Sequence, residues 1–216
     1  MFESWQRSLE DGQDLSPSCD DFRSTPFLSF FRPSSFAFYL LFLQEDIDWL
    51  TFVTAQTFFH YYYAKHSFRR HPRFNVLVAC FFLAGKVTEC PNRAARDLTA
   101  LVLRANRLWL RRPATADPRA DLSDDQLAQL KRDVLSCERT LLHAIAFDLI
   151  VPNPQKFVME KIKLAAFDTP TVPPDLKKAF GAKIFEFLKY AMRTSLCLQY
   201  PPSYLAAAAV RVVALP

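Results

Sequence analysis

The chain has 216 residues, half of them hydrophobic, and a formal net charge of +5. This apolar content is enough for a packed core, which excludes disorder for most of the sequence. Only three glycines are present, so tight β-turns and phosphate-binding loops have little material, and the composition predicts an all-α fold. The charge suits an acidic partner surface but is low for a dedicated nucleic-acid-binding protein.

The cysteines and the N-terminal residues bear on the compartment. The five cysteines are odd in number, widely spaced and mostly within apolar runs, which favours buried reduced thiols over disulfides or zinc ligands. The first ten residues lack the basic and apolar regions of a signal peptide. No apolar run approaches the roughly 18 residues that cross a bilayer. We therefore expect a cytosolic or nuclear protein with no membrane segment.

The pattern along the chain changes near residue 34. Residues 1–33 mix Ser, Asp and Pro without a helical period, which predicts a loosely ordered N-terminal arm. Beyond them, apolar periodicity and end signals such as the capping-box pair Ser123 and Gln126 predict successive helices. Five are expected in the first unit, at about 34–44, 46–66, 72–88, 93–111 and 123–147.

A second set of helices follows the proline-rich segment 151–154. Three are expected, at about 154–168, 174–197 and 202–215. A repeat of the first unit would need five helices, so residues 151–216 are expected to form only a partial second unit.

Two of the expected helices have a charged residue within an apolar stripe. In 72–88 the stripe through Val76 and Leu83 reaches Lys86, and in 123–147 a stripe through Leu135 and Leu142 contains Glu138. The two charges could pair with each other inside the fold. Alternatively, both lie at the rim of an apolar surface that binds a partner, where charges determine orientation. Spacing alone leaves both interpretations open.

The residues around these charges resemble the cyclin box. The segments are Leu83–Glu89 (LAGKVTE) and Leu135–Leu142 (LSCERTLL), the latter followed by Phe147-Asp148-Leu149. The similarity runs from about Ser34 to the end and is greatest to the transcriptional cyclin K and cyclin T branch. Three further segments carry that branch similarity: Phe59–Phe68, Pro72-Arg73 and Ser195–Pro202. The substrate-docking motif of cell-cycle cyclins is absent from the first expected helix.

The resemblance implies a cyclin fold, with one complete five-helix cyclin box over 34–150 and a truncated second box over 151–216. It implies a nuclear, non-enzymatic subunit that activates a cyclin-dependent serine/threonine kinase in RNA polymerase II transcription elongation. By resemblance, the kinase-binding residues are Lys86, Glu138, Leu142, Phe147 and Leu149, with Val87 and Glu89 as weaker candidates. The family motif has an acid where this chain has Thr88.

Two other functions are kept as alternatives. The same fold serves as a nucleic-acid-binding module in general transcription factors resembling TFIIB, and a degenerate cyclin-like scaffold would bind without activating. The basic stretch Lys65, Arg69, Arg70 and Arg73 is compatible with an acidic or nucleic-acid partner, although helix-dipole stabilisation explains much of it. No metal-ligand spacing and no nucleophile–base pair is recognisable, so we expect no metal, no cofactor and no catalysis.

Overall fold

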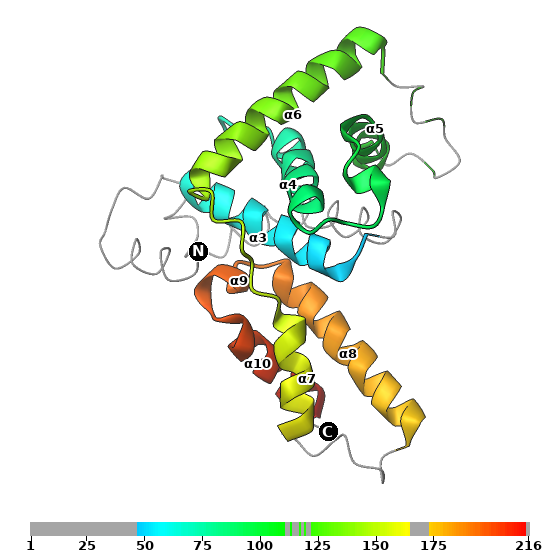
Figure 1. The fold of residues 1–216 in the computed structure, drawn as a ribbon, viewed down its shortest axis with the longest axis vertical. Helices are drawn as coiled ribbons and strands as arrows, with labels where there is room; N and C mark the ends of the chain where they lie inside the picture. Colours follow the sequence, from blue (N-terminus) through cyan, green and yellow to red (C-terminus); the bar gives the residue numbers. More distant parts are fainter. Residues whose placement is uncertain are drawn as a thin grey trace. The chain divides into compact units, whose positions relative to one another are not determined.

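The computed structural model describes residues 47–110, 122–164 and 173–214, together with 113, 117 and 119. Within these residues the regular elements are all helices (Figure 1), which confirms the all-α prediction. The expected arm 1–33 and the expected helix 34–44 lie outside the described residues, so the count of five helices in the first unit stays a prediction. The described residues divide into two compact units on either side of the Ile150–Val151 bond.

Within residues 47–110 and 122–150, the first unit shows four α-helices and a short 3-10 helix. These elements are α3 (Trp49–Lys65), α4 (Arg73–Val87), η2 (Arg93–Ala95), α5 (Leu98–Trp109) and α6 (Asp124–Ala144). The helix α4 packs against α3, α5 and α6. Nearly all of α3 is buried, including the large rings of Phe52, Phe58 and Tyr62. Among the described elements α4 is the central helix, because it contacts α3, η2, α5 and α6.

The described helices of the first unit are shorter than the sequence predicts. The expected helix 46–66 begins at Trp49, because Asp48 is its N-cap. The expected helix 93–111 begins at Leu98, because the Asp97 side chain accepts a hydrogen bond from Thr99 N at 2.9 Å and caps α5 there. The expected helix 123–147 ends at Ala144, since Ala146 and Phe147 take the left-handed conformation that ends a helix. The capping-box prediction at the start of α6 is confirmed.

In the second unit the described residues 151–164 and 173–214 form α7 (Pro154–Leu164), α8 (Pro174–Met192), α9 (Leu196–Gln199) and α10 (Pro202–Ala214). The expected helix 174–197 was too long. The Thr194 hydroxyl donates to Ala191 O at 2.6 Å and accepts from Leu196 N at 3.3 Å, replacing helical bonds between α8 and α9. Ala206 and Ala209 are fully buried where α10 packs against α7 and α8, as expected of small side chains at a close helix contact.

Cysteine side chains in the described residues are in the thiol form. Cys80 and Cys90 are buried, Cys137 and Cys197 are half-buried, and none of these four forms a disulfide. Burial raises the pKa of the Cys80 and Cys137 thiols, so both stay protonated at neutral pH. No helix in the described part of the chain is long and apolar enough to cross a membrane.

Candidate partner-binding site

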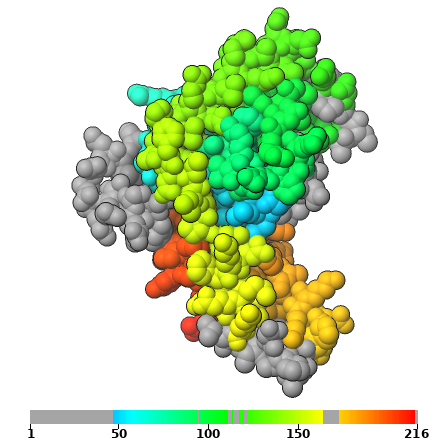
Figure 2. All heavy atoms as spheres, in the orientation of Figure 1, coloured from blue at the N-terminus to red at the C-terminus, as the bar shows by residue number. Residues whose placement is uncertain are grey.

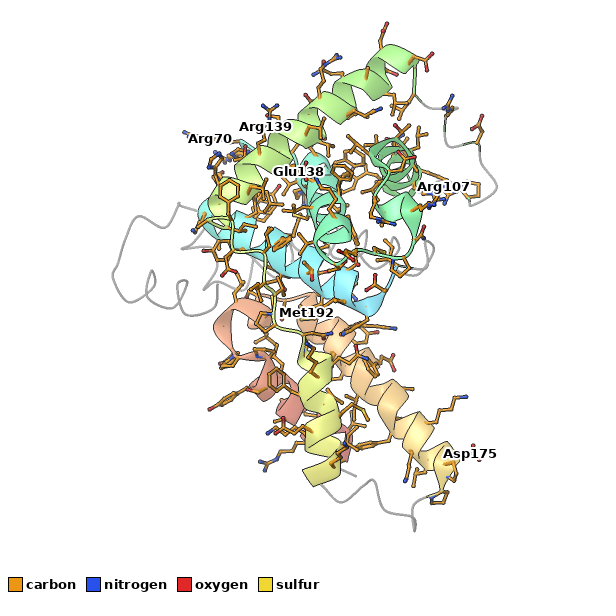
Figure 3. The ribbon with its side chains drawn as sticks, in the orientation of Figure 1. Arg70, Arg107, Glu138, Arg139, Asp175 and Met192 are labelled. Carbon is orange, nitrogen blue, oxygen red and sulfur yellow. The ribbon has the colours of Figure 1, made fainter. Side chains whose placement is uncertain are left out.

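Lys86 and Glu138 meet in the structure although 52 residues separate them in sequence. Lys86 lies in the last turn of α4 and Glu138 lies on α6, which packs along α4. The Lys86 ammonium donates a hydrogen bond to Glu138 Oε1 in a salt bridge. Figure 3 shows Glu138 directed from α6 toward α4. The interpretation that the two charges pair with each other therefore holds.

The pair is nevertheless open to solvent on one side. The Glu138 side chain is 10% exposed, whereas that of Lys86 is 43% exposed. Lys86 Nζ also lies 4.2 Å from the centroid of the Phe82 ring, a cation–π distance. A half-exposed ammonium fixed by a carboxylate and a ring keeps donors for another acceptor, because an ammonium has three. Lys86 and Glu138 can therefore pair with each other and still lie at the rim of a surface that binds a partner.

The backbone around Lys86 is held by two close contacts. A Cβ built on Gly85 would lie 2.7 Å from Ala95 O, so only glycine lets α4 approach η2 this closely. At Thr88, the position where the family motif has an acid, the hydroxyl oxygen lies 2.8 Å from Ala84 O and 2.5 Å from the Thr51 hydroxyl, and its single hydrogen donates to one of the two. The end of α4 is therefore tied to η2 and to the start of α3.

The hydrogen bonds continue from Thr51 to Asp48, the N-cap of α3. Burial acts to raise the pKa of the Asp48 carboxyl, but hydrogen bonds from the Thr51 side chain, Cys90 and the Thr51 backbone outweigh it and lower that pKa. Asp48 is thus held as a carboxylate, so Thr88 belongs to a polar network within the unit. This gives the departure from the family motif a structural explanation.

Beside the ion pair, large apolar side chains are exposed along α6 and in the segment that follows it. Figure 2 shows α6 at the surface of the first unit. Exposure is 38% for Leu135, 60% for Phe147 and 81% for Ile150, while Leu142 and Leu149 are half-buried. We call these five residues the apolar rim. A rim of this kind beside a fixed ion pair is typical of a protein-binding surface.

Phe147 is exposed and has an unusual backbone conformation. Ala146 and Phe147 have φ of 52° and 58°, a conformation that costs energy in residues other than glycine, asparagine and aspartate. Phe147 N donates to Leu142 O at 2.9 Å, which closes the end of α6, and the ring makes an edge contact with His143 at 5.5 Å. The chain therefore maintains a costly conformation that leaves an aromatic ring in solvent.

The remaining expected site residues occupy the end of α4. Val87 is half-buried, and Glu89 is exposed with φ 51° and forms no ion pair with another described residue. Sequence reasoning did not include Phe82 or Ile150. Phe82 could have been found from its spacing of four residues before Lys86, which puts both on one helix face. Nothing local indicates that Ile150 is exposed.

No group of three or more His, Cys, Asp or Glu side chains in the described residues is arranged to hold a metal ion. The apolar rim and the ion pair can contribute to recognition of a partner, through burial of apolar area and through one cation and one carboxylate that orient it.

Comparison with known proteins defines the class. The model of the cyclin N-terminal domain matches residues 32–150, which include Lys86, Glu138 and the whole apolar rim. The chain belongs to the cyclin family. Within the family it resembles the cyclin T and cyclin K branch, which confirms the resemblance seen in the sequence.

Three relatives illustrate this similarity. Cyclin-T1-3 of Oryza sativa subsp. japonica is 30% identical over 98% of this chain and 41% of the relative. Cyclin-K of Danio rerio is 32% identical over 73% of this chain and 33% of the relative. Putative cyclin-T1-1 of Arabidopsis thaliana is 29% identical over 97% of this chain and 78% of the relative. The chain thus spans less than half the length of the first two.

Proposed function

We propose that the chain is the activating regulatory subunit of a cyclin-dependent serine/threonine protein kinase, and that it acts in the nucleus in RNA polymerase II transcription elongation. Membership of the cyclin family and similarity to cyclin T and cyclin K proteins support the proposal. The observation that carries it is the Lys86–Glu138 ion pair beside the exposed apolar rim. In this proposal residues 34–150 form the first cyclin box and 151–216 part of a second.

The mechanism that fits this surface is allosteric. A protein kinase is active only when a lysine of its β3 strand pairs with a glutamate of its αC helix. A subunit that binds the αC-in form more tightly than the αC-out form shifts the population toward the active form. The shift is limited by the difference in affinity between the two forms, and a full switch needs about 5.5 kcal/mol.

In this proposal the αC-in form covers the apolar rim and the αC-out form does not, so burial of the rim contributes to the difference in affinity. Complete burial of one large apolar side chain contributes about 1.5–3 kcal/mol. Leu135, Phe147 and Ile150 are the most exposed members of the rim, so they gain most by being covered. The ion pair helps to orient the kinase, because a like charge placed opposite Lys86 or Glu138 would make binding less favourable.

The test is capture of a kinase by the tagged chain from nuclear extract, followed by an activity assay on a peptide of the RNA polymerase II C-terminal repeat. Lys86→Ala combined with Glu138→Ala is expected to lower capture at least about tenfold, because in this proposal each charge also pairs with a kinase group, and a close charge pair across an interface contributes about 1.5 kcal/mol or more. The matched control removes Glu160 and Lys161, an exposed and a half-buried residue whose charges lie 3.9 Å apart in the second unit. The control is expected to retain capture.

A second variant separates loss of binding from loss of folding. Phe147→Asn with Ile150→Ser removes two exposed side chains, and asparagine tolerates the left-handed conformation at position 147. Its thermal melt is expected to match that of the wild type while kinase capture falls. If the wild-type chain captures no kinase, or both variants capture as much as the wild type, the proposal is wrong.

A further inference from the structure

The net charge of the chain comes from one continuous segment. Between Trp49 and Thr88 the sequence has five Lys or Arg residues and no Asp or Glu. The whole chain has 27 basic and 22 acidic residues, so the remainder contains 22 of each sign and is balanced. The segment therefore holds the entire excess of +5. The question is which group, within the chain or on a partner, lies opposite these basic residues.

Four of these five basic residues lie where α3 ends and α4 begins. We call residues 65–73 the basic turn: it contains Lys65, Arg69, Arg70 and Arg73. The two helices that flank it contain no carboxylate anywhere along their length. Neither flanking helix can therefore neutralise the turn.

The backbone of the basic turn is held in place on both sides. Arg70 N and His71 N donate to Ser67 O at 3.2 and 3.3 Å, and Arg69 N donates to Ser67 Oγ at 3.2 Å. On the helix side, the Tyr63 hydroxyl donates to His71 O at 2.9 Å, and the Tyr62 hydroxyl lies 2.8 Å from His71 Nδ1. The turn is therefore pre-organised, which lowers the entropy lost when a ligand binds.

The cationic groups of the turn differ in availability. Lys65 Nζ is engaged, because it donates to Ala144 O at 2.9 Å and lies over the Tyr61 ring. Arg69 and Arg70 are exposed and form no ion pair with any carboxylate of the described residues. Figure 3 shows Arg70 at the outer edge of the first unit. The guanidinium groups of two consecutive residues on a fixed backbone are thus available to an anion.

We propose that the basic turn is a docking site for a phosphorylated peptide segment of a partner protein, with the phosphate held by Arg69 and Arg70. A guanidinium presents planar paired donors that match phosphate oxygens bidentately. A phosphoserine or phosphothreonine brings close to two negative charges and three acceptor oxygens, which two arginines can satisfy. This proposal does not depend on kinase activation, since it involves none of the residues of the apolar rim.

The surroundings of the turn favour a phosphopeptide over a nucleic acid. Single-stranded nucleic acids need exposed aromatic rings on which bases stack. The rings beside the turn are unsuitable, because Tyr62 and Tyr63 are fully buried and Phe68 stacks on Tyr63 at 4.1 Å. Typical specific binding of duplex DNA uses about 6–10 phosphate contacts along a track, whereas the free cations here are two neighbouring residues.

The test measures fluorescence anisotropy of a labelled degenerate peptide library with one fixed phosphoserine, and of the same library without phosphate. The wild-type chain is expected to bind the phosphorylated library at least about tenfold more tightly at physiological salt, in line with charge-assisted hydrogen bonds. Arg69→Gln with Arg70→Gln is expected to remove this preference. The control, Arg96→Gln with Arg132→Gln, changes two exposed arginines of the same unit and is expected to keep it.

Three results would overturn the proposal. These are equal binding of the two libraries, an equal loss in the control, and tighter binding of a single-stranded oligonucleotide that depends on Arg69 and Arg70. The variant Lys86→Ala with Glu138→Ala keeps both arginines, so phosphopeptide binding is expected to persist when kinase capture is lost. The two proposals can therefore fail independently.

Discussion

The two units of the chain bury their helices to different depths. In the first, α3 is covered along nearly its whole length, and α4 and α6 pack on each other. In the second, α8 buries only a stripe of Ile184, Leu188, Ala191 and Met192. The candidate kinase-binding residues all belong to the deeply packed unit. An ion pair and a left-handed aromatic residue need a rigid support, and a well-packed core provides one.

The largest expected effect is the loss of unfolding free energy when a core leucine of either unit is replaced by alanine. Leu141 on α6 and Leu188 on α8 are both fully buried. Leu141→Ala is expected to lower the free energy of unfolding by about 4 kcal/mol and Leu188→Ala by about 2–3 kcal/mol, because a narrow stripe collapses more easily around a cavity. Urea denaturation followed by circular dichroism measures both. Equal losses would show that the two units are packed equally well.

Glycine substitutions sharpen the same contrast. Gly85→Ala brings a methyl group to 2.7 Å from Ala95 O, a backbone atom that cannot swing away. We expect a loss of about 1–3 kcal/mol in unfolding free energy and, because Lys86 follows directly, weaker kinase capture. A Gly85→Ala variant that is as stable as the wild type would contradict the close approach of α4 and η2.

Gly181 in α8 is the matched position in the second unit. It has nothing within 4 Å of a built Cβ and lies inside a helix. Gly181→Ala is therefore expected to raise the unfolding free energy by about 0.4–1 kcal/mol, because alanine restricts the unfolded chain. Thermal denaturation of Gly181→Ala, Gly85→Ala and the wild type compares the effects of the two substitutions on stability. A destabilised Gly181→Ala would mean that this face of α8 is covered.

The smallest expected effect is that of pH on the stability of the first unit. All four histidines of the sequence lie in this unit. Burial, followed by nearby positive charge, lowers the pKa of His66 and His71 below 6.5. Below pH 6.5 the unfolded chain then binds more protons than the folded chain, so stability is expected to fall as pH decreases from about 7 to 5. Above this window neither histidine contributes.

The control for this dependence is His66→Gln, which removes one titrating ring next to Tyr62. Its unfolding free energy is expected to change less between pH 7 and pH 5 than that of the wild type. An unchanged pH dependence would assign the effect to other groups.

Some features followed from the sequence alone. The all-α class and the cyclin resemblance depend on helix propensity, periodicity and the order of motifs, and these are encoded within short windows. The start of α6 was predictable because Ser123 and Gln126 satisfy each other's backbone groups locally. The positions of Lys86 and Glu138 within apolar stripes were also predictable, because helical periodicity is a local property of the sequence.

Other features depended on tertiary structure. The ends of α6 and α8 and the start of α5 differ from the predicted bounds, since periodicity does not report a left-handed Phe147 or the hydrogen bonds of the Thr194 hydroxyl between α8 and α9. Whether Lys86 and Glu138 pair or stand apart is a property of α4 packing on α6. Exposure of Phe147 and Ile150 is likewise decided by which side chains the fold leaves uncovered. Contacts between residues distant in sequence form only when the chain packs, so no local pattern contains them.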